Sequence, residues 1–279
     1  MIQALWKFEF LQNAFMAGIL IGIIAPLLGV FIVVRRQALI ADALSHITLA
    51  GIAASLLLGK YVTFWQGINP VYMGMGFSAV GSLFIEQLRK VYKHFEELAI
   101  PITLSGGIGL SVVFLSLADG FNSDLFNYLF GSVIAISRGD LLTVAVITVV
   151  VILVVTILYK ELFFLSFDEE QAIVSGIRGK LIHFIFILLV AFVIAVSMQI
   201  VGVLLVSALM TIPVAASIRI ARGFKQTIGF SILFGEVAVL GGLVLAYYLD
   251  IAPGGTIVLL SALILVAVLL FKQLKQRKS

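Results

Sequence analysis

Asp42 and His46 lie four residues apart in the segment 35–51, RRQALIADALSHITLAG. On a helix, side chains at this spacing lie on one face, one turn apart. A carboxylate oxygen and an imidazole nitrogen placed in this way can bind one cation together, and imidazole suits zinc and other late first-row metals. Two ligands are too few for a closed tetrahedral site, whereas a twofold dimer would supply two of each.

The same two residues also fit a purely structural role. Asp42 would then cap its helix, and His46 would hydrogen-bond across a helix interface. Their spacing alone does not decide between the two interpretations.

Polar residues in later apolar segments are further candidates for an ion path. Glu236 lies in the middle of residues 230–239, FSILFGEVAV, where a carboxylate is costly unless it is paired or protonated. It would line the path or hydrogen-bond a neighbouring helix. Thr211 and Pro213 predict a break in their helix, which would free backbone groups for a cavity or simply kink the helix for packing. Ser207 belongs to the same stretch and completes the candidate ion path.

Three ionisable residues lie near the ends of apolar segments. Glu86 is close to Arg89 and Lys90, which indicates a side chain that extends to the lipid headgroups. His94 and His183 are predicted to make polar contacts at the same interface.

The composition requires a membrane to surround these residues. The 279-residue chain is 62% hydrophobic and 11% charged, whereas soluble domains are roughly 45–50% apolar and about 25% charged. It contains no cysteine, which excludes disulfides, thiolate metal sites and a cysteine nucleophile. We therefore predict an all-α polytopic integral membrane protein that forms one domain over residues 1–279.

Nine apolar segments are long enough to cross a bilayer, whose apolar core is about 30 Å thick. Eight crossings would also fit if the third segment does not cross, or if a broken helix spans the junction at 198–200. Residues 121–136 are short, aromatic and mixed, which favours an interfacial or re-entrant helix. The nine predicted segments are residues 10–34, 38–58, 69–88, 98–118, 140–160, 181–198, 200–218, 226–249 and 255–271.

The distribution of lysine and arginine predicts the orientation. If the C-terminus is cytoplasmic and the nine segments alternate, all of the 18 basic residues except Lys7, Lys60 and Arg138 lie on the cytoplasmic side. This asymmetry follows the positive-inside rule and places the N-terminus outside. Eight crossings would move the N-terminus inside.

The largest cytoplasmic loop, residues 160–180, is the only one long enough for a short docking helix. The chain contains no GxxxxGK[ST] phosphate loop. If transport is driven by ATP, hydrolysis would therefore take place in a separate polypeptide, and this chain would not be an enzyme.

Five segments, in order along the chain, resemble those of the ABC-3 family of metal permeases, which serve zinc, manganese and iron importers. The segment ALIADALSHITLAG resembles the second-helix signature of the family. The other four are YLFGSVIAIS (128–137), DEEQAIVSGIRG (168–179), VGVLLVSALMTIPVAASIRIA (201–221) and YYLDIAPGGTIVL (247–259).

The resemblance implies a type II-like ABC importer transmembrane domain with 8–9 helices. It also implies a homodimer in the bacterial cytoplasmic membrane, cytoplasmic ABC ATPase subunits and an extracytoplasmic metal-binding protein, with no nucleic acid and no permanently bound cofactor. The family's aspartate and histidine match Asp42 and His46 as metal ligands. Its ATPase-coupling segment matches the loop 161–180, with the coupling residues Asp168, Glu169, Glu170, Ala172 and Gly176.

The sequence favours zinc as the transported ion. Residues 47–51, ITLAG, resemble the zinc-type branch, because manganese-type members tend to have Leu-Pro-Gly there. Ser132 departs from the family, in which many members have an aspartate after the Phe-Gly pair.

Four other functions remain open. The chain could be a manganese or iron importer of the same family, or a permease for a metal chelate or vitamin. It could also be a gradient-driven secondary transporter in which Glu236 and Asp42 carry protons, or a non-transporting scaffold.

Overall fold

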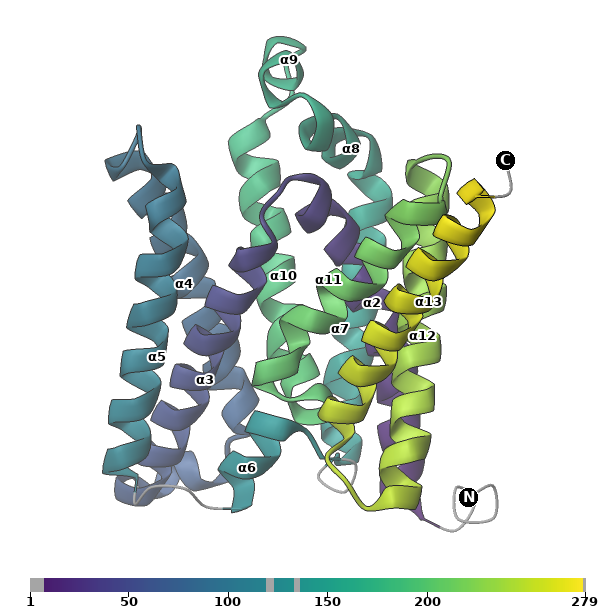
Figure 1. Ribbon diagram of the computed structural model, residues 1–279. Helices are drawn as coiled ribbons and strands as arrows, with labels where there is room; N and C mark the ends of the chain where they lie inside the picture. Colours follow the sequence, from purple (N-terminus) through teal and green to yellow (C-terminus); the bar gives the residue numbers. More distant parts are fainter. Residues whose placement is uncertain (1–7, 119–122, 133–135, 278–279) are drawn as a thin grey trace.

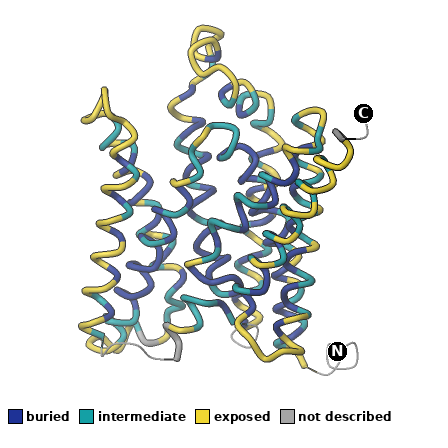
Figure 2. Tube along the Cα trace, viewed as in Figure 1, coloured by how far each residue is buried: buried dark blue, intermediate teal, exposed yellow. Residues whose placement is uncertain are grey.

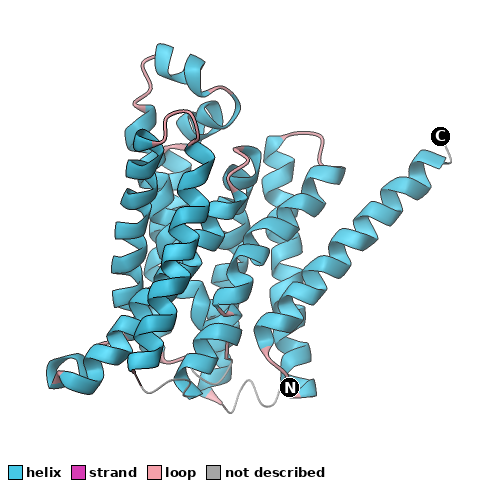
Figure 3. Ribbon diagram, turned by 60° about the vertical axis from the view of Figure 1, so that its left-hand side comes forward, coloured by secondary structure: helices cyan, strands magenta, loops and turns pink. Residues whose placement is uncertain are grey.

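The computed structural model describes residues 8–118, 123–132 and 136–277, and these residues form a helical bundle without strands (Figures 1 and 3). Five short elements join or flank the long helices: η1 (Thr63–Gly67), η2 (Glu96–Leu98), α6 (Ser123–Phe130), α8 (Tyr159–Phe167) and α9 (Glu169–Val174). The long helices are α2 (Glu9–Val34), α3 (Ala38–Tyr61), α4 (Pro70–Val91), α5 (Ala99–Leu117), α7 (Arg138–Ile157), α10 (Gly179–Val201), α11 (Val203–Ile220), α12 (Phe224–Leu249) and α13 (Pro253–Arg277).

Each of the nine predicted segments corresponds to one long helix. Within the described ranges, eight helices are long and apolar enough to cross a membrane. Helix α4 is not among these eight, because the polar residues Glu86, Gln87, Arg89 and Lys90 near its end lower its hydropathy, but it has 22 residues and packs along α3. Helix α2 begins at one end of the bundle and α13 ends at the other (Figure 1), as nine crossings require.

Burial separates an inner group of helices from an outer group (Figure 2). Within the membrane-spanning windows, 72% of α3 and of α10 is buried, compared with 22% of α13 and 28% of α5. Helix α13 also leans away from the rest of the bundle (Figure 3). The apolar residues on α5 and α13 are therefore available to lipid or to another protein chain.

The two ends of the bundle differ in charge. Helices α8 and α9 lie at one end, here called the α9 end, with the α2–α3 turn, the α4–α5 and α11–α12 connections and the end of α13 (Figure 1). Helix α6 lies at the other, the α6 end. The basic clusters predicted for the cytoplasmic side therefore gather at the α9 end, whereas Lys60 and Arg138 lie at the α6 end. Lys7 and Lys278 lie outside the described residues.

The predicted break at Thr211 and Pro213 is wrong. Helix α11 is continuous through Pro213, because a proline removes only one ladder bond and the flanking turns are held by neighbouring helices. The chain breaks at Gly202, which has a φ of +85° and lies close to the junction predicted at 198–200. A side chain there would collide with the backbone of Leu129 and Phe130, so only glycine fits this left-handed junction.

The segment predicted to be interfacial contains α6, a short helix at its end of the bundle, although residues 121–122 and 133–135 lie outside the described residues. Its last turn leads into Gly131, and the Ser132 amide donates to the Gln199 carbonyl at 3.0 Å. Helix α6 is therefore fastened beside the junction between α10 and α11.

Candidate functional site

Asp42 and His46 lie in the first three turns of α3, which follows α2 after a three-residue turn. Arg36 adopts a left-handed φ of 58°, the Gln37 amide donates to the Ile32 carbonyl at 2.9 Å, and the Arg36 amide donates to the Val33 carbonyl at 3.0 Å. This pair of bonds is the Schellman ending of a helix. It ties the first turn of α3 to the end of α2.

Asp42 does not cap α3, so this part of the structural interpretation is wrong. The N-cap residue is Gln37, and no side chain bonds the first turn. Asp42 is half-buried and accepts a hydrogen bond from the Ser207 hydroxyl on α11 at 3.2 Å. Asp42 and Ser207 were both candidates from the sequence, and the structure brings them into contact.

Thr211 lies one turn beyond Ser207 on α11. Its hydroxyl donates to the Ser207 carbonyl at 2.9 Å, so its oxygen keeps lone pairs for another partner. Helices α3 and α11 run in opposite directions (Figure 1). Relative to the Asp42–Ser207 contact, His46 therefore lies toward the α6 end and Thr211 toward the α9 end. The four residues form a polar strip between two helices.

His46 is held at its backbone rather than at its ring. Its carbonyl accepts a hydrogen bond from the Ser111 hydroxyl on α5 at 3.1 Å. One turn earlier on α5, a side chain at Gly107 would come within 3.2 Å of the His46 carbonyl carbon. Among the described residues, the half-buried imidazole makes no hydrogen bond, so its nitrogens remain available to an ion.

The described part of one chain does not supply a complete metal cage. It contains no group of three or more His, Cys, Asp or Glu side chains that could hold a metal ion. Asp42, His46 and the Ser207 hydroxyl therefore form an incomplete donor set. Such a set suits a transported ion, which has to leave again.

Glu236 lies on α12 against α2, whereas the polar strip lies on α3 and α11. A side chain at Gly22 would come within 2.8 Å of its Oε1 atom, and this oxygen is buried without a hydrogen-bond partner in the described structure. The preceding residue on the helix, Gly235, packs against Pro26. No contact with a described residue joins Glu236 to Asp42 or His46.

The predicted coupling loop folds into the short helices α8 and α9, of which α9 projects from the bundle (Figure 1). Asp168 caps α9 by accepting from the Gln171 amide at 2.9 Å. Glu169 and Glu170 are exposed in its first turn, whereas Ala172 is buried. Gly176 follows with a φ of +86°, which glycine adopts at little cost.

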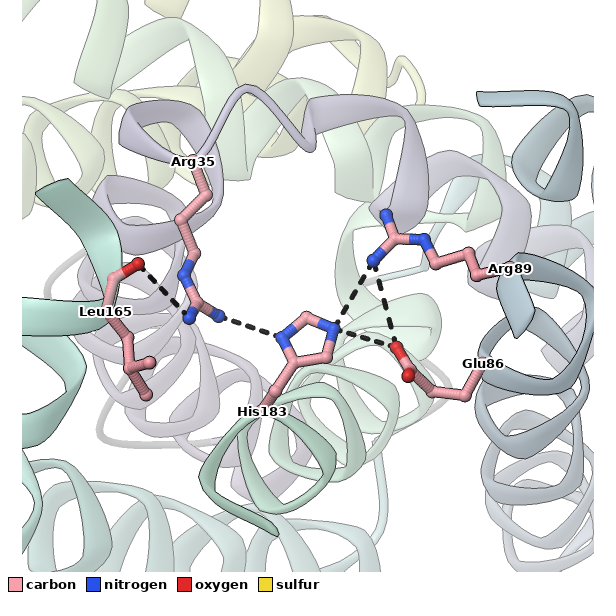
Figure 4. Close-up of polar contacts among 5 residues, drawn as sticks. All are labelled: Arg35, Glu86, Arg89, Leu165 and His183. Atoms are coloured by element: carbon pink, nitrogen blue, oxygen red, sulfur yellow. Dashed lines mark hydrogen bonds and ion pairs between the residues drawn. The ribbon is translucent and has the colours of Figure 1, made fainter. Parts of the chain in front are cut away.

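A partly buried polar cluster at the α9 end was not anticipated. The His183 cluster consists of Arg35, Glu86, Arg89 and His183 (Figure 4). His183 is only 9% exposed, and its ring lies 2.9 Å from Arg35 Nη1 and 2.8 Å from Glu86 Oε1. The predicted headgroup contact for His183 and the predicted outward extension of Glu86 are therefore wrong. His94 is exposed, and its headgroup contact stays a prediction.

A second buried cluster lies at the α6 end around Asp140. Its carboxylate accepts from the side-chain amides of Asn69 at 2.5 Å and Gln199 at 3.1 Å, and from the Ser137 hydroxyl at 2.7 Å. Ser137 and Asp140 form a capping box. The Ser-x-x-Asp spacing was the sequence signal that could have revealed it.

A helical bundle with many membrane crossings and a polar strip in its interior defines an integral membrane transport subunit. The profile of the ABC 3 transport family matches residues 7–272. The chain belongs to this family.

Individual relatives match over almost the whole chain. The manganese import system permease protein ScaB of Streptococcus gordonii is 34% identical, over 94% of this chain and 91% of ScaB. The high-affinity zinc uptake system membrane protein ZnuB of Haemophilus influenzae is 31% identical, over 93% of this chain and 96% of ZnuB.

A solved structure also matches the fold. PsaBC from Streptococcus pneumoniae in complex with Fab superposes with a TM-score of 0.83 and 30% identity, covering 96% of this chain and 93% of that chain. The predicted fold class is confirmed.

Proposed function

We propose that the chain is the membrane permease subunit of an ATP-driven importer for a divalent first-row transition metal, with zinc as the favoured ion. The observation that carries this proposal is the polar strip on α3 and α11. It presents a carboxylate, an imidazole with unbonded nitrogens and a hydroxyl inside a membrane bundle. Such N and O donors suit late first-row metals.

The relatives support a metal as the transported substrate but differ in the ion. ScaB is named for manganese and ZnuB for zinc, at 34% and 31% identity. We favour zinc on residues 47–51, and the harder carboxylate of Asp42 makes manganese the main alternative.

Completion of the site requires a second copy of the chain. Each copy contributes one aspartate and one histidine, and a twofold axis beside α3 would bring two of each around the ion. This homodimer would receive the ion from an extracytoplasmic metal-binding protein.

Separate ATPase subunits would dock on α8 and α9, where Asp168, Glu169, Glu170, Ala172 and Gly176 lie. The concentration of basic residues at the α9 end supports a cytoplasmic location for it and for the C-terminus.

Metal uptake in a strain that lacks the native gene tests the proposal. Complementation with the wild type should restore zinc uptake, whereas Asp42→Ala and His46→Ala should abolish uptake without preventing assembly in the membrane. His94→Ala is the matched control, because His94 is exposed and lies outside the strip. Normal uptake by both strip variants would overturn the site. Restored manganese uptake in place of zinc would overturn the favoured ion only.

A gradient-driven secondary transporter is the second candidate, and the buried, unbonded oxygen of Glu236 favours it. In that case Glu236 would carry a proton, and uptake would persist without an ATPase subunit but stop when an uncoupler is added. Uptake that requires the ATPase and survives replacement of Glu236 by glutamine would exclude it.

A further inference from the structure

The His183 cluster connects elements that have to move together if ATP hydrolysis drives transport. Arg35 belongs to the α2–α3 turn, Glu86 and Arg89 to α4, and His183 to α10 (Figure 4). Arg35 Nη2 also donates to the Leu165 carbonyl on α8 at 3.5 Å. The cluster therefore joins the base of the α8–α9 segment to the start of the helix that carries Asp42 and His46.

Hydrogen-bond chemistry defines the direction of each contact. An arginine side chain only donates, so His183 Nδ1 has to accept from Arg35 at 2.9 Å. The proton of the neutral ring then lies on Nε2, which donates to Glu86 Oε1 at 2.8 Å. Arg89 Nη1 lies 3.4 Å from the same nitrogen but finds no acceptor there, because Nε2 carries the proton. Arg89 pairs with the same carboxylate at 3.8 Å. His183 thus links a cation on one side to an anion on the other.

The α9 segment also acts on Arg35 through charge. Burial lowers the pKa of the Arg35 guanidinium, and the negative charge of Glu169 on α9 opposes this shift. Glu169 also lines, with Glu86 and His183, a cavity of about 580 Å³ at this end of the bundle. A displacement of α9 would therefore change the electrostatic potential at Arg35 even while the hydrogen bonds of Arg35 remain intact.

Packing makes the connection stiff at both ends. A side chain at Gly179, one turn before His183, would lie 3.3 Å from Leu165 and 3.4 Å from Ile173, so α8, α9 and the start of α10 form one compact unit. At the other end, the Schellman turn ties Arg35 to the first turn of α3. A shift of Arg35 is therefore passed to Asp42.

We propose that Arg35 and His183 are positioning residues that transmit movement of the α8–α9 segment to the metal-holding helix α3. Neither residue touches the ion. Loss of the connection should leave ATP hydrolysis intact but disconnect it from transport. This inference rests on the proposed function, because it requires an ATP-driven importer.

The test uses the full permease with its ATPase in proteoliposomes and measures the metal ions transported per ATP hydrolysed. His183→Leu removes both bonds, so this ratio should fall about tenfold while ATP hydrolysis continues, as loss of a charge-assisted bond allows. His183→Gln should restore most of the ratio, because its amide can accept from Arg35 and donate to Glu86. A purely structural role would lower transport and hydrolysis together.

Two further variants keep the test decisive if His183→Leu does not assemble. Arg35→Ala breaks the same connection from the α3 side and should lower the ratio to a similar extent. Arg36→Gln is its matched control, because Arg36 is the exposed neighbour outside the cluster. An unchanged ratio in Arg35→Ala or His183→Leu would overturn the inference. If the wild type itself transports no metal, the proposed function has failed.

Discussion

The polar strip contains few polar groups, so removal of any one of them should measurably change metal uptake. Asp42 accepts from Ser207 across the α3–α11 interface at 3.2 Å, and this bond restricts the carboxylate to a small set of orientations. The hydroxyl oxygen keeps a lone pair that can face the ion. Under the proposed function, Ser207 would both orient one ligand and supply a weak ligand of its own.

Ser207→Ala should raise the metal concentration needed for half-maximal uptake by about fivefold, since a hydrogen bond to a charged group contributes roughly 1.5–3 kcal/mol and part of this is recovered by water. Transport assays over a range of metal concentrations measure the change. Ser45→Ala is the control, because among the described residues the Ser45 hydroxyl bonds only the Ala41 carbonyl of its own helix, at 2.7 Å. An identical half-maximal concentration in both variants would show that Ser207 plays no part.

At the scale of elements, α3 is held in place by close contact with α5. Gly107 faces the backbone of His46 and Ile47, and the Ser111 hydroxyl bonds the His46 carbonyl. Small residues permit such close helix approach within a membrane. The neighbouring Gly106 has open space around it, so two adjacent glycines on one helix have different roles.

Gly107→Ala should destabilise the protein and lower uptake, because the added methyl group would lie 3.0 Å from the Ile47 amide nitrogen and push α5 away from α3. Gly106→Ala should be neutral or slightly stabilising, by up to about 1 kcal/mol, because alanine loses less backbone entropy in a helix. Thermal unfolding of the purified variants, with uptake measured in parallel, distinguishes them. Equal melting temperatures would contradict the assigned packing.

At the scale of the whole molecule, the chain has two chemically different ends. The α9 end collects most of the described basic residues, and α9 projects from it (Figure 1). Arg138 at the α6 end is paired with Glu9. This asymmetry predicts a cytoplasmic α9 end and an external α6 end.

The absence of cysteine from the chain makes this orientation directly testable by labelling. Val174→Cys on α9 and Phe64→Cys on η1 place one thiol at each end, and the native side chains there are 87% and 77% exposed. A membrane-impermeant maleimide applied to spheroplasts should label only Phe64→Cys, and Val174→Cys should react after permeabilisation. The opposite pattern would reverse the orientation, and labelling of both from outside would rule out an odd number of crossings between them.

The sequence by itself determined the class of structure and the main candidate residues. Apolar runs of about 20 residues predict membrane helices. Each of the nine runs forms a long helix, and eight of these described helices are long and apolar enough to cross a membrane. The i, i+4 spacing placed Asp42 and His46 on one face of α3 because helix geometry is local. The positions of α8 and α9 also followed from the one long polar loop.

Only the tertiary structure decided which residues meet. Ser207 and Asp42 are 165 positions apart, and Arg35 and His183 are 148 apart, so no local periodicity relates them. His183 looked like a headgroup contact because its neighbours in sequence are basic and interfacial, but its partners come from α4 and from the α2–α3 turn. Pro213 looked like a break, whereas the break lies at Gly202, where the backbone of another segment leaves no room for a side chain. Local patterns predict helices, but long-range packing selects the partners of each polar group.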